Sequence, residues 1–397
     1  MSQQEQVRPE IQSIRDKDAA GETLTTRELF ILKSRTFPHS VDFLEKLKGE
    51  KEYDKRELVE IFYAAARYLD DAAEDSKLKI PKKKHLMNLF GRAITEVARR
   101  ESSESLEDII TGELKEITDT ALEATSDDDS KIFFRQFGKG AIFRDIQHLA
   151  HSVKDVFRDS LTTMAYGMEM FLDKGEISNL EELDSYAYYV AGILGEGLGK
   201  IVRIVDGYEG LNYSHARKLG KLLQTTNIIK NIREDIDARA RFPDSRIVFL
   251  PKEMYDPMTP FDLVYSSERK AKKLRRITFE GMLSIAKNNI EEAVQYIIRI
   301  PKELNGYKAF CLHPVITAIE NLKLMERAGA EQVFRGEAKA VKISPYTFKK
   351  ITSFVPDLIR SGKADAWIEE YSVEPSKYSF TETSYSPKRY ARWSSRW

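Results

Sequence analysis

Two acid-bearing stretches carry the residue types that could do chemistry. The first reads IFYAAARYLDDAAED over residues 61–75, and its Ala and Leu residues favour an uninterrupted helix. On a helix, Asp70 shares a face with Glu74, and Asp71 shares a face with Asp75. Like charges at this spacing repel, and a hard divalent cation such as Mg²⁺ would neutralise them. A solvated acidic helix end is the alternative that this stretch alone leaves open.

The second stretch reads LLQTTNIIKNIREDID over residues 222–237. Gln224, Asn227, Asn231 and Asp235 fall at i, i+3, i+7 and i+11, which places them on one stripe of a helix. Each amide in a core would need a hydrogen-bond partner, so the stripe predicts the lining of a wet cavity. Two such helices facing each other across a bundle would form a metal or ligand site.

The two stretches resemble the aspartate-rich motifs of the squalene and phytoene synthase family, the head-to-head trans-prenyl transferases. The first motif is held by Arg67 to Asp75, and the second, with its Gln-x-x-Asn-Ile pattern, by Gln224 to Asp235. The resemblance covers residues 29–343 and includes four shorter segments in the family's order: Lys33-Ser34-Arg35-Thr-Phe37, Tyr186-Ala-Tyr-Tyr189-Val-Ala-Gly192, Phe310-Cys-Leu-His-Pro314 and Gln332-Val-Phe-Arg-Gly336.

This resemblance implies an all-α fold, a single isoprenoid-synthase helical bundle around a central prenyl-binding cavity. The expected domain covers residues 27–345, after a polar lead (1–26) and before a C-terminal extension with a basic-aromatic tail (346–397). The implied reaction condenses two farnesyl diphosphates through a presqualene-type cyclopropane and reduces the product to squalene with NADPH. One alternative makes dehydrosqualene or phytoene, or cyclises one prenyl diphosphate, without reduction. Another is a weakened scaffold that binds prenyl lipids.

The resemblance also assigns roles to individual residues. The implied ligands of Mg²⁺, or of Mn²⁺, are Asp70, Asp71, Glu74, Asp75, Asn231, Glu234 and Asp235. The implied catalytic residues are Tyr186, whose ring would stabilise a cation, with Arg67, Asp70 and Asp235. The implied binding residues for the prenyl diphosphate are Ser34, Arg35, Phe37, Tyr63, Arg67, Tyr189, Gln224, Asn227, Lys230 and Arg246. Tyr63, Asn227 and Lys342 are implied for NADPH.

Three positions depart from the family's pattern. Asn231 replaces the first Asp of the second motif, and Glu74 replaces the last Asp of the first. An Asn supplies only a neutral carbonyl oxygen, so one expected carboxylate is lost. Ser344 stands where the family's C-terminal segment carries an Arg, so one of the positive charges that the resemblance implies for NADPH is missing.

The composition of the chain limits the classes of protein to which it could belong. The 397 residues contain 63 basic and 63 acidic side chains, so no overall basic field suggests nucleic acid. The single cysteine excludes an intrachain disulfide and fits a reducing cytosol. No apolar run reaches the length of a membrane-spanning helix. We expect a cytoplasmic monomer. Its ending, SPKRYARWSSRW, mixes cations with Tyr390, Trp393 and Trp397 and either contacts an anionic membrane or forms a disordered tail.

The candidate site residues must be positioned by the helices that carry them. Hydrophobic periodicity predicts helices over residues 56–75, 86–100, 105–124, 143–172, 186–205, 216–237, 268–299 and 307–328. Several glycines between residues 192 and 199 predict a close backbone approach to a neighbouring helix or a chain-like ligand. Residues 77–84 are expected to form a solvated basic linker, and the helical pattern weakens from Ile343 onward.

Overall fold

The structure, a computed structural model, describes residues 9–34, 37–44, 54–72, 77–125, 127–244, 247–336, 341–378 and 380. These residues form helices, and their β-structure is limited to an isolated bridge between Ile177 and Pro251. The predicted all-α class is therefore confirmed. The helices are α1 (Pro9–Ala19), α2 (Thr26–Lys33), α3 (Phe37–Val41), α4 (Lys55–Asp70), α5 (Ile80–Arg99), α6 (Glu107–Ile109), α7 (Lys115–Ala124), α8 (Asp128–Gly138), α9 (Ala141–Gln147), α10 (His151–Lys174), α11 (Leu180–Ala187), α12 (Ile193–Asp206), α13 (Tyr213–Arg241), α14 (Pro260–Tyr265), α15 (Arg269–Asn288), α16 (Ile290–Arg299), α17 (Asn305–Arg335), α18 (Pro345–Arg360) and α19 (Ala364–Val373).

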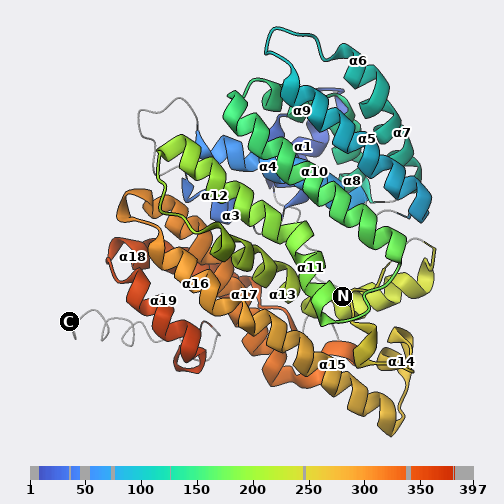
Figure 1. Ribbon diagram of the computed structural model, residues 1–397, viewed down its shortest axis with the longest axis vertical. Coiled ribbons are helices and arrows are strands. Elements are labelled where there is room, and N and C mark those ends of the chain that lie inside the picture. Colours follow the sequence, from blue (N-terminus) through green and yellow to red (C-terminus); the bar gives the residue numbers. More distant parts are fainter. Residues whose placement is uncertain are drawn as a thin grey trace.

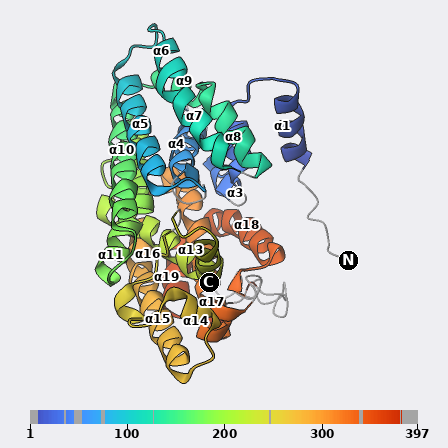
Figure 2. The same cartoon turned by 90° about the vertical axis from the view of Figure 1, so that its right-hand side faces the viewer.

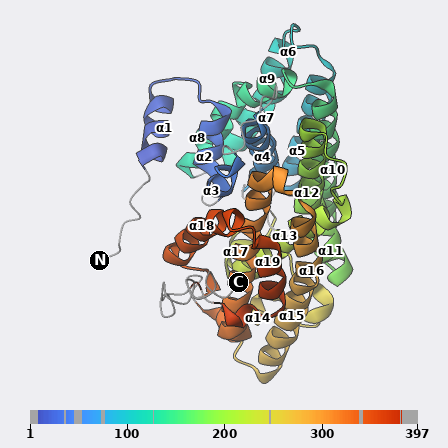
Figure 3. The same ribbon diagram turned by 90° about the vertical axis from the view of Figure 1, so that its left-hand side faces the viewer.

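The helices gather into two packed groups (Figure 1). In one group α5 packs along α10, and α4, α7, α8 and α9 pack around them. In the other group α13 contacts α15, α16 and α17, and α18 and α19 cover α17 and α16. Helix α12 contacts α10 and α4 on one side and α13 on the other, so it joins the groups. Figures 2 and 3 show the first group above the second.

Helix α4 forms because its sequence satisfies both its start and its packing face. The side chain of Asp54 caps the first turn by accepting from the backbone N–H of Arg56. Ala64, Ala65 and Ala66 are buried and let neighbouring helices approach closely. The helix ends at Asp70, so the acidic motif lies at its C-terminal end.

The glycines near α12 do permit a close helix contact, as the sequence predicts. A Cβ atom added to Gly195 would lie 2.4 Å from the carbonyl oxygen of Ala216 on α13. A Cβ atom added to Gly220 would lie 2.2 Å from the carbonyl oxygen of Ala191. Backbone therefore packs on backbone where the chain before and within α12 meets α13.

Two expectations about the elements were wrong. The predicted linker at 77–84 enters α5, because Pro81 occupies the first turn, where its missing N–H costs nothing. The single helix expected over 268–299 is interrupted at Asn289, whose side chain donates to the carbonyl of Ile285. Beyond Ile343, where the pattern weakens, α18 and α19 pack on α17 and α16. Within the described ranges, no helix is long and apolar enough to cross a membrane.

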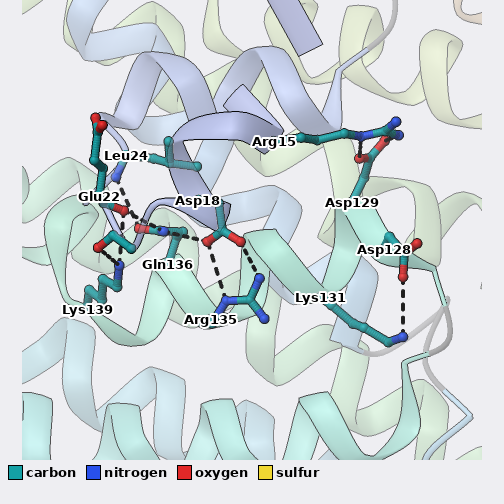
Figure 4. Close-up of polar contacts among 11 residues, drawn as sticks. Arg15, Asp18, Glu22, Leu24, Asp128, Asp129, Lys131, Arg135, Gln136 and Lys139 are labelled. Carbon is teal, nitrogen blue, oxygen red and sulfur yellow. Dashed lines mark hydrogen bonds and ion pairs between the residues drawn. The ribbon is translucent and has the colours of Figure 1, made fainter. Parts of the chain in front are cut away.

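The N-terminal helix α1 is joined to α8 mainly by polar contacts (Figure 4). Arg15 donates two hydrogen bonds to Asp129, at 2.8 and 3.0 Å. Asp18 accepts a hydrogen bond of 2.7 Å from Gln136. Ile14 is the buried residue of α1. The polar lead predicted from the sequence thus contains a helix that docks through charge.

Candidate active site

A cavity of about 850 Å³ is lined by residues of α4 and α13, and residues of α2, α3, α8, α12 and α17 form much of the rest of its wall. The size is typical of a small-molecule site. Its charged lining, the name used below for its ionic side chains, consists of Lys33, Arg67, Asp70, Asp71, Lys77, Asp127, Asp129 and Lys230. Its apolar lining includes Phe37, Phe62, Tyr63, Met164, Leu194, Leu198, Leu219, Leu223 and Phe310.

The carboxylate of Asp71 is the most deeply buried member of the charged lining. Only 1% of its side chain is exposed. It pairs with Lys33 of α2, whose Nζ lies 2.6 Å from Oδ2, and with Arg67 of its own helix. Lys33 also donates to the hydroxyl of Ser130 on α8, at 2.7 Å. Arg67 also pairs with Asp70, which is more exposed. One ionic cluster therefore joins α2, α4 and α8.

The α13 side of the cavity carries amides and one amine. Gln224, Asn227 and Lys230 line it, as the polar stripe predicts. Burial and, to a smaller extent, the nearby ammonium of Lys342 lower the pKa of Lys230 to about 8, although Glu234 acts in the opposite direction. A lysine with this pKa titrates close to neutral pH.

The last turns of the second motif lie outside the cavity lining. Asn231 donates from Nδ2 to Oδ1 of Asn227, at 3.3 Å. Glu234 pairs with Lys342, at 2.9 Å. Asp235 is not among the lining residues. The described part of the chain contains no group of three His, Cys, Asp or Glu side chains arranged for a metal.

Of the seven predicted metal ligands, the structure thus brings Asp70 and Asp71 to the cavity. Glu74 and Asp75 lie outside the described residues, and so do the predicted substrate-binding residues Arg35 and Arg246.

Aromatic side chains build the wall next to the charged lining. The ring of Tyr63 stacks on Phe37 with centroids 4.7 Å apart, and Phe37 meets Phe310 edge-on at 5.4 Å. Ser34, another predicted substrate residue, is buried and also lines the cavity. Tyr63 precedes Asp70 by seven residues, about 10 Å along the helix. The cavity therefore changes from charged to aromatic along α4.

Tyr186 and Tyr189, the two tyrosines of the Val-Ala-Gly segment that were assigned roles, do not line this cavity. Tyr186 is buried, stacked on Phe249 at 4.3 Å and edge-on to Phe171 at 5.2 Å. Tyr189 packs over Gly167, where an added Cβ atom would come within 2.2 Å of its ring. The catalytic role of Tyr186 and the substrate role of Tyr189 stay predictions.

A family model described as squalene/phytoene synthase matches residues 34–347, which include both motifs and nearly the whole cavity lining. The chain belongs to the squalene/phytoene synthase family. Squalene synthase 8 of Panax ginseng is 32% identical over 195 residues, which cover 48% of this chain and 46% of that protein. The chain thus matches about half the length of this relative. Squalene synthase of Homo sapiens is 25% identical over 334 residues, covering 82% of this chain and 69% of that protein.

Two solved structures have the same fold at low sequence identity. The complex of TcSQS with the ligand BPH1237 has a TM-score of 0.64 and 19% identity, and covers 87% of this chain and 89% of that chain. A dehydrosqualene synthase in complex with a ligand has a TM-score of 0.52 and 17% identity, and the match covers 89% of this chain and 99% of that chain. The isoprenoid-synthase bundle predicted from the family resemblance is confirmed.

Sequence reasoning missed a polar relay in the cavity wall of this family member. His313 of α17 is buried, and its Nδ1 lies 2.8 Å from the Ser40 hydroxyl. Its Nε2 lies 3.0 Å from the hydroxyl of Thr352, which donates its own proton to the carbonyl of Phe348. Nε2–H therefore donates to Thr352, and Nδ1 accepts from Ser40. No sequence pattern links residues so far apart.

The Lys33–Asp71 pair gives a first prediction. Lys33→Met leaves the buried Asp71 carboxylate with one cation instead of two, and should lower the free energy of unfolding by about 2–3 kcal/mol. Urea denaturation measures this. The matched control is Lys131→Met, because Lys131 pairs with Asp128 at 3.4 Å on the surface. It should cost less than about 0.5 kcal/mol. Equal losses for the two variants would contradict the burial argument.

His313 gives a second prediction. Burial lowers its pKa from 6.5 to about 3, so between these values the unfolded chain binds a proton that the folded protein does not. Folding stability must therefore fall as the pH drops below 6.5, by up to about 1.4 kcal/mol per pH unit from this group. His313→Gln should remove that slope. Stability curves of wild type and variant that run parallel between pH 6.5 and about 4 would refute this.

Proposed function

We propose that this protein condenses two farnesyl diphosphates head to head, through a presqualene-type cyclopropane, and reduces the product to squalene. The supporting observation is the division of one cavity into a charged lining and an aromatic, apolar lining along α4. A prenyl diphosphate has the same division, with a charged head and a hydrocarbon chain. The names of the relatives support the same reaction class.

The residues present suit a magnesium ion by the chemistry of their donor atoms. Asp70 and Asp71 offer carboxylate oxygens from α4, and Gln224 and Asn227 offer amide oxygens from α13 on the same cavity. Hard divalent cations, Mg²⁺ or Mn²⁺, prefer such oxygen ligands. Asp70 and Asp71 would hold the ion. When bound, it would neutralise charge on the departing diphosphate.

The chain's own cations would bind the diphosphate. Lys33 and Arg67 lie beside the acidic motif, and Lys230 enters from α13. Their charges stabilise a leaving group that gains negative charge as the bond to the prenyl carbon breaks. The rings of Phe37 and Tyr63 would face the carbocation, because aromatic faces attract cations and supply no nucleophile.

The reductive step of this proposal requires a site for NADPH. Tyr63 and Asn227, two of the three residues expected to contact NADPH, line the cavity. The third, Lys342, is outside the lining and pairs with Glu234. NADPH binding would therefore have to compete with Glu234 for the ammonium of Lys342.

The function is tested by incubating the protein with farnesyl diphosphate and Mg²⁺, with and without NADPH. We expect diphosphate release in both cases and squalene with NADPH. Release without any reduced hydrocarbon would refute the reductive step, and no release would refute the whole proposal.

Asp70→Asn should lower the rate of diphosphate release by about 100-fold or more, because the lost carboxylate is proposed to hold the ion that acts on the departing charge. Asp128→Asn, an exposed neighbour on α8, is the matched control.

Lys230 predicts the pH dependence of substrate binding. The anion binds the protonated amine, whose pKa is about 8 in the free protein. The KM for farnesyl diphosphate should therefore rise as the pH increases through 8. Lys230→Arg keeps its charge at all these pH values and should remove the rise. Lys230→Met should have a high KM throughout. The same rise in the Arg variant as in wild type would show that another group titrates.

A further inference from the structure

Helix α14 presents large apolar side chains to solvent. Phe261 is 49% exposed and Tyr265 is 45% exposed, and their ring centroids lie 4.2 Å apart. The Tyr265 hydroxyl donates to Asp237, and the guanidinium of Arg233 lies 4.9 Å from the Tyr265 ring. These contacts fix the aromatic pair in place although it is exposed. Neighbouring α15 adds Ile277, which is 36% exposed.

The outer face of α15 is strongly basic. Its exposed cations are Arg269, Lys270, Lys272, Lys273 and Arg276. Lys270, Lys273 and Ile277 fall at i, i+3 and i+7, so an apolar side chain lies on the same stripe as two lysines. Arg276 lies 3.7 Å from Glu280, and the other four cations have no ion-pair partner within the described ranges.

This charge is a local excess. The whole chain has as many acidic as basic residues, 63 of each. Residues 261–280 carry six basic and three acidic side chains. One of these acids, Asp262, is already used in the capping box of α14. Unpaired cations repel one another, so a face of this kind is stabilised by an anionic partner.

Helix α14 and the start of α15 form one preformed unit. Arg275 is 1% exposed and donates from Nη1 to the carbonyl oxygens of Leu263 and Ser266, at 2.8 and 3.0 Å. Its Nε pairs with Glu331 of α17, at 2.9 Å. Figures 1, 2 and 3 all place the turn between α14 and α15 at the same extremity of the molecule. The exposed residues of this unit, Phe261, Tyr265, Arg269, Lys270, Lys272, Lys273, Arg276 and Ile277, are called the α14–α15 tip.

We propose that the α14–α15 tip docks on an anionic lipid surface. Acidic headgroups attract cations, and each Lys or Arg near the surface adds to the binding. Aromatic and aliphatic side chains gain energy at the boundary between headgroups and acyl chains. The tip offers both on one preformed projection, whereas a purely electrostatic partner would leave Phe261 and Ile277 without a role. The proposal does not depend on the reaction that the cavity performs.

Vesicle co-sedimentation of the full chain tests the proposal. We expect binding to phosphatidylcholine vesicles that contain about a third phosphatidylserine, and at least about tenfold weaker binding to phosphatidylcholine alone. Lys270→Glu/Lys273→Glu should weaken binding to the anionic vesicles by at least about tenfold. Phe261→Ser should weaken it by about threefold or more, including at high salt, where charge is screened. Far-UV circular dichroism confirms that the variants fold.

The matched control is Lys302→Glu/Lys349→Glu, the same charge change at exposed lysines elsewhere on the molecule. It should bind like wild type, and the basic-aromatic C-terminal tail is identical in every variant. An equal loss in this control would show non-specific attraction and overturn the proposal. Binding of wild type that does not depend on phosphatidylserine would do so as well. A single-stranded RNA that competes at lower concentration than the vesicles would assign the tip to nucleic acid instead.

Discussion

The burial of one carboxylate constrains the charged side of the cavity. Asp71 lies at the C-terminal end of α4, where the helix dipole disfavours negative charge, and only 1% of its side chain reaches solvent. Such a carboxylate is tolerated only with cations beside it. Lys33 and Arg67 supply them, and Lys33 also holds Ser130 on α8. The spacing of α2, α4 and α8 is therefore tied to the neutralisation of a single charge.

This pairing has a consequence for ligand binding. Lys33 and Arg67 are paired with Asp71 and Asp70, so a diphosphate that bound here as proposed would have to share these cations with internal carboxylates. The net attraction for an anion is then small unless a further positive charge is added. A divalent cation on the acidic motif would add it, and the protonated form of Lys230 would contribute from the opposite helix. If the cavity binds a diphosphate as proposed, charge balance would favour binding of the metal and the substrate together.

Local pattern in the sequence was enough to predict α4 and the polar stripe of α13, because helix periodicity decides which residues share a face. It could not decide where that stripe leaves the cavity. Gln224, Asn227 and Lys230 line it, whereas Asp235 does not, and the difference depends on how remote helices pack on α13. The contact between His313 and Ser40 joins positions 273 residues apart, which no local signal encodes. Family motifs predicted the fold correctly, since packing is shared even at low identity.

Asn231, which replaces an Asp of the family's second motif, makes a contact that depends on its amide. The Asn231 side chain donates to Oδ1 of Asn227, a contact that a carboxylate could not make because it has no proton to give. One turn later, Glu234 is matched by Lys342. The second motif has thus exchanged an acid for an amide, and one of its remaining acids is neutralised by a lysine. What α13 presents to the cavity is amide oxygen and the amine of Lys230, so the acidic character of the site comes from the α4 side. The two helices thus differ in what they bring to the cavity: α4 supplies the carboxylates of Asp70 and Asp71 together with Arg67, and α13 supplies amides and the amine of Lys230.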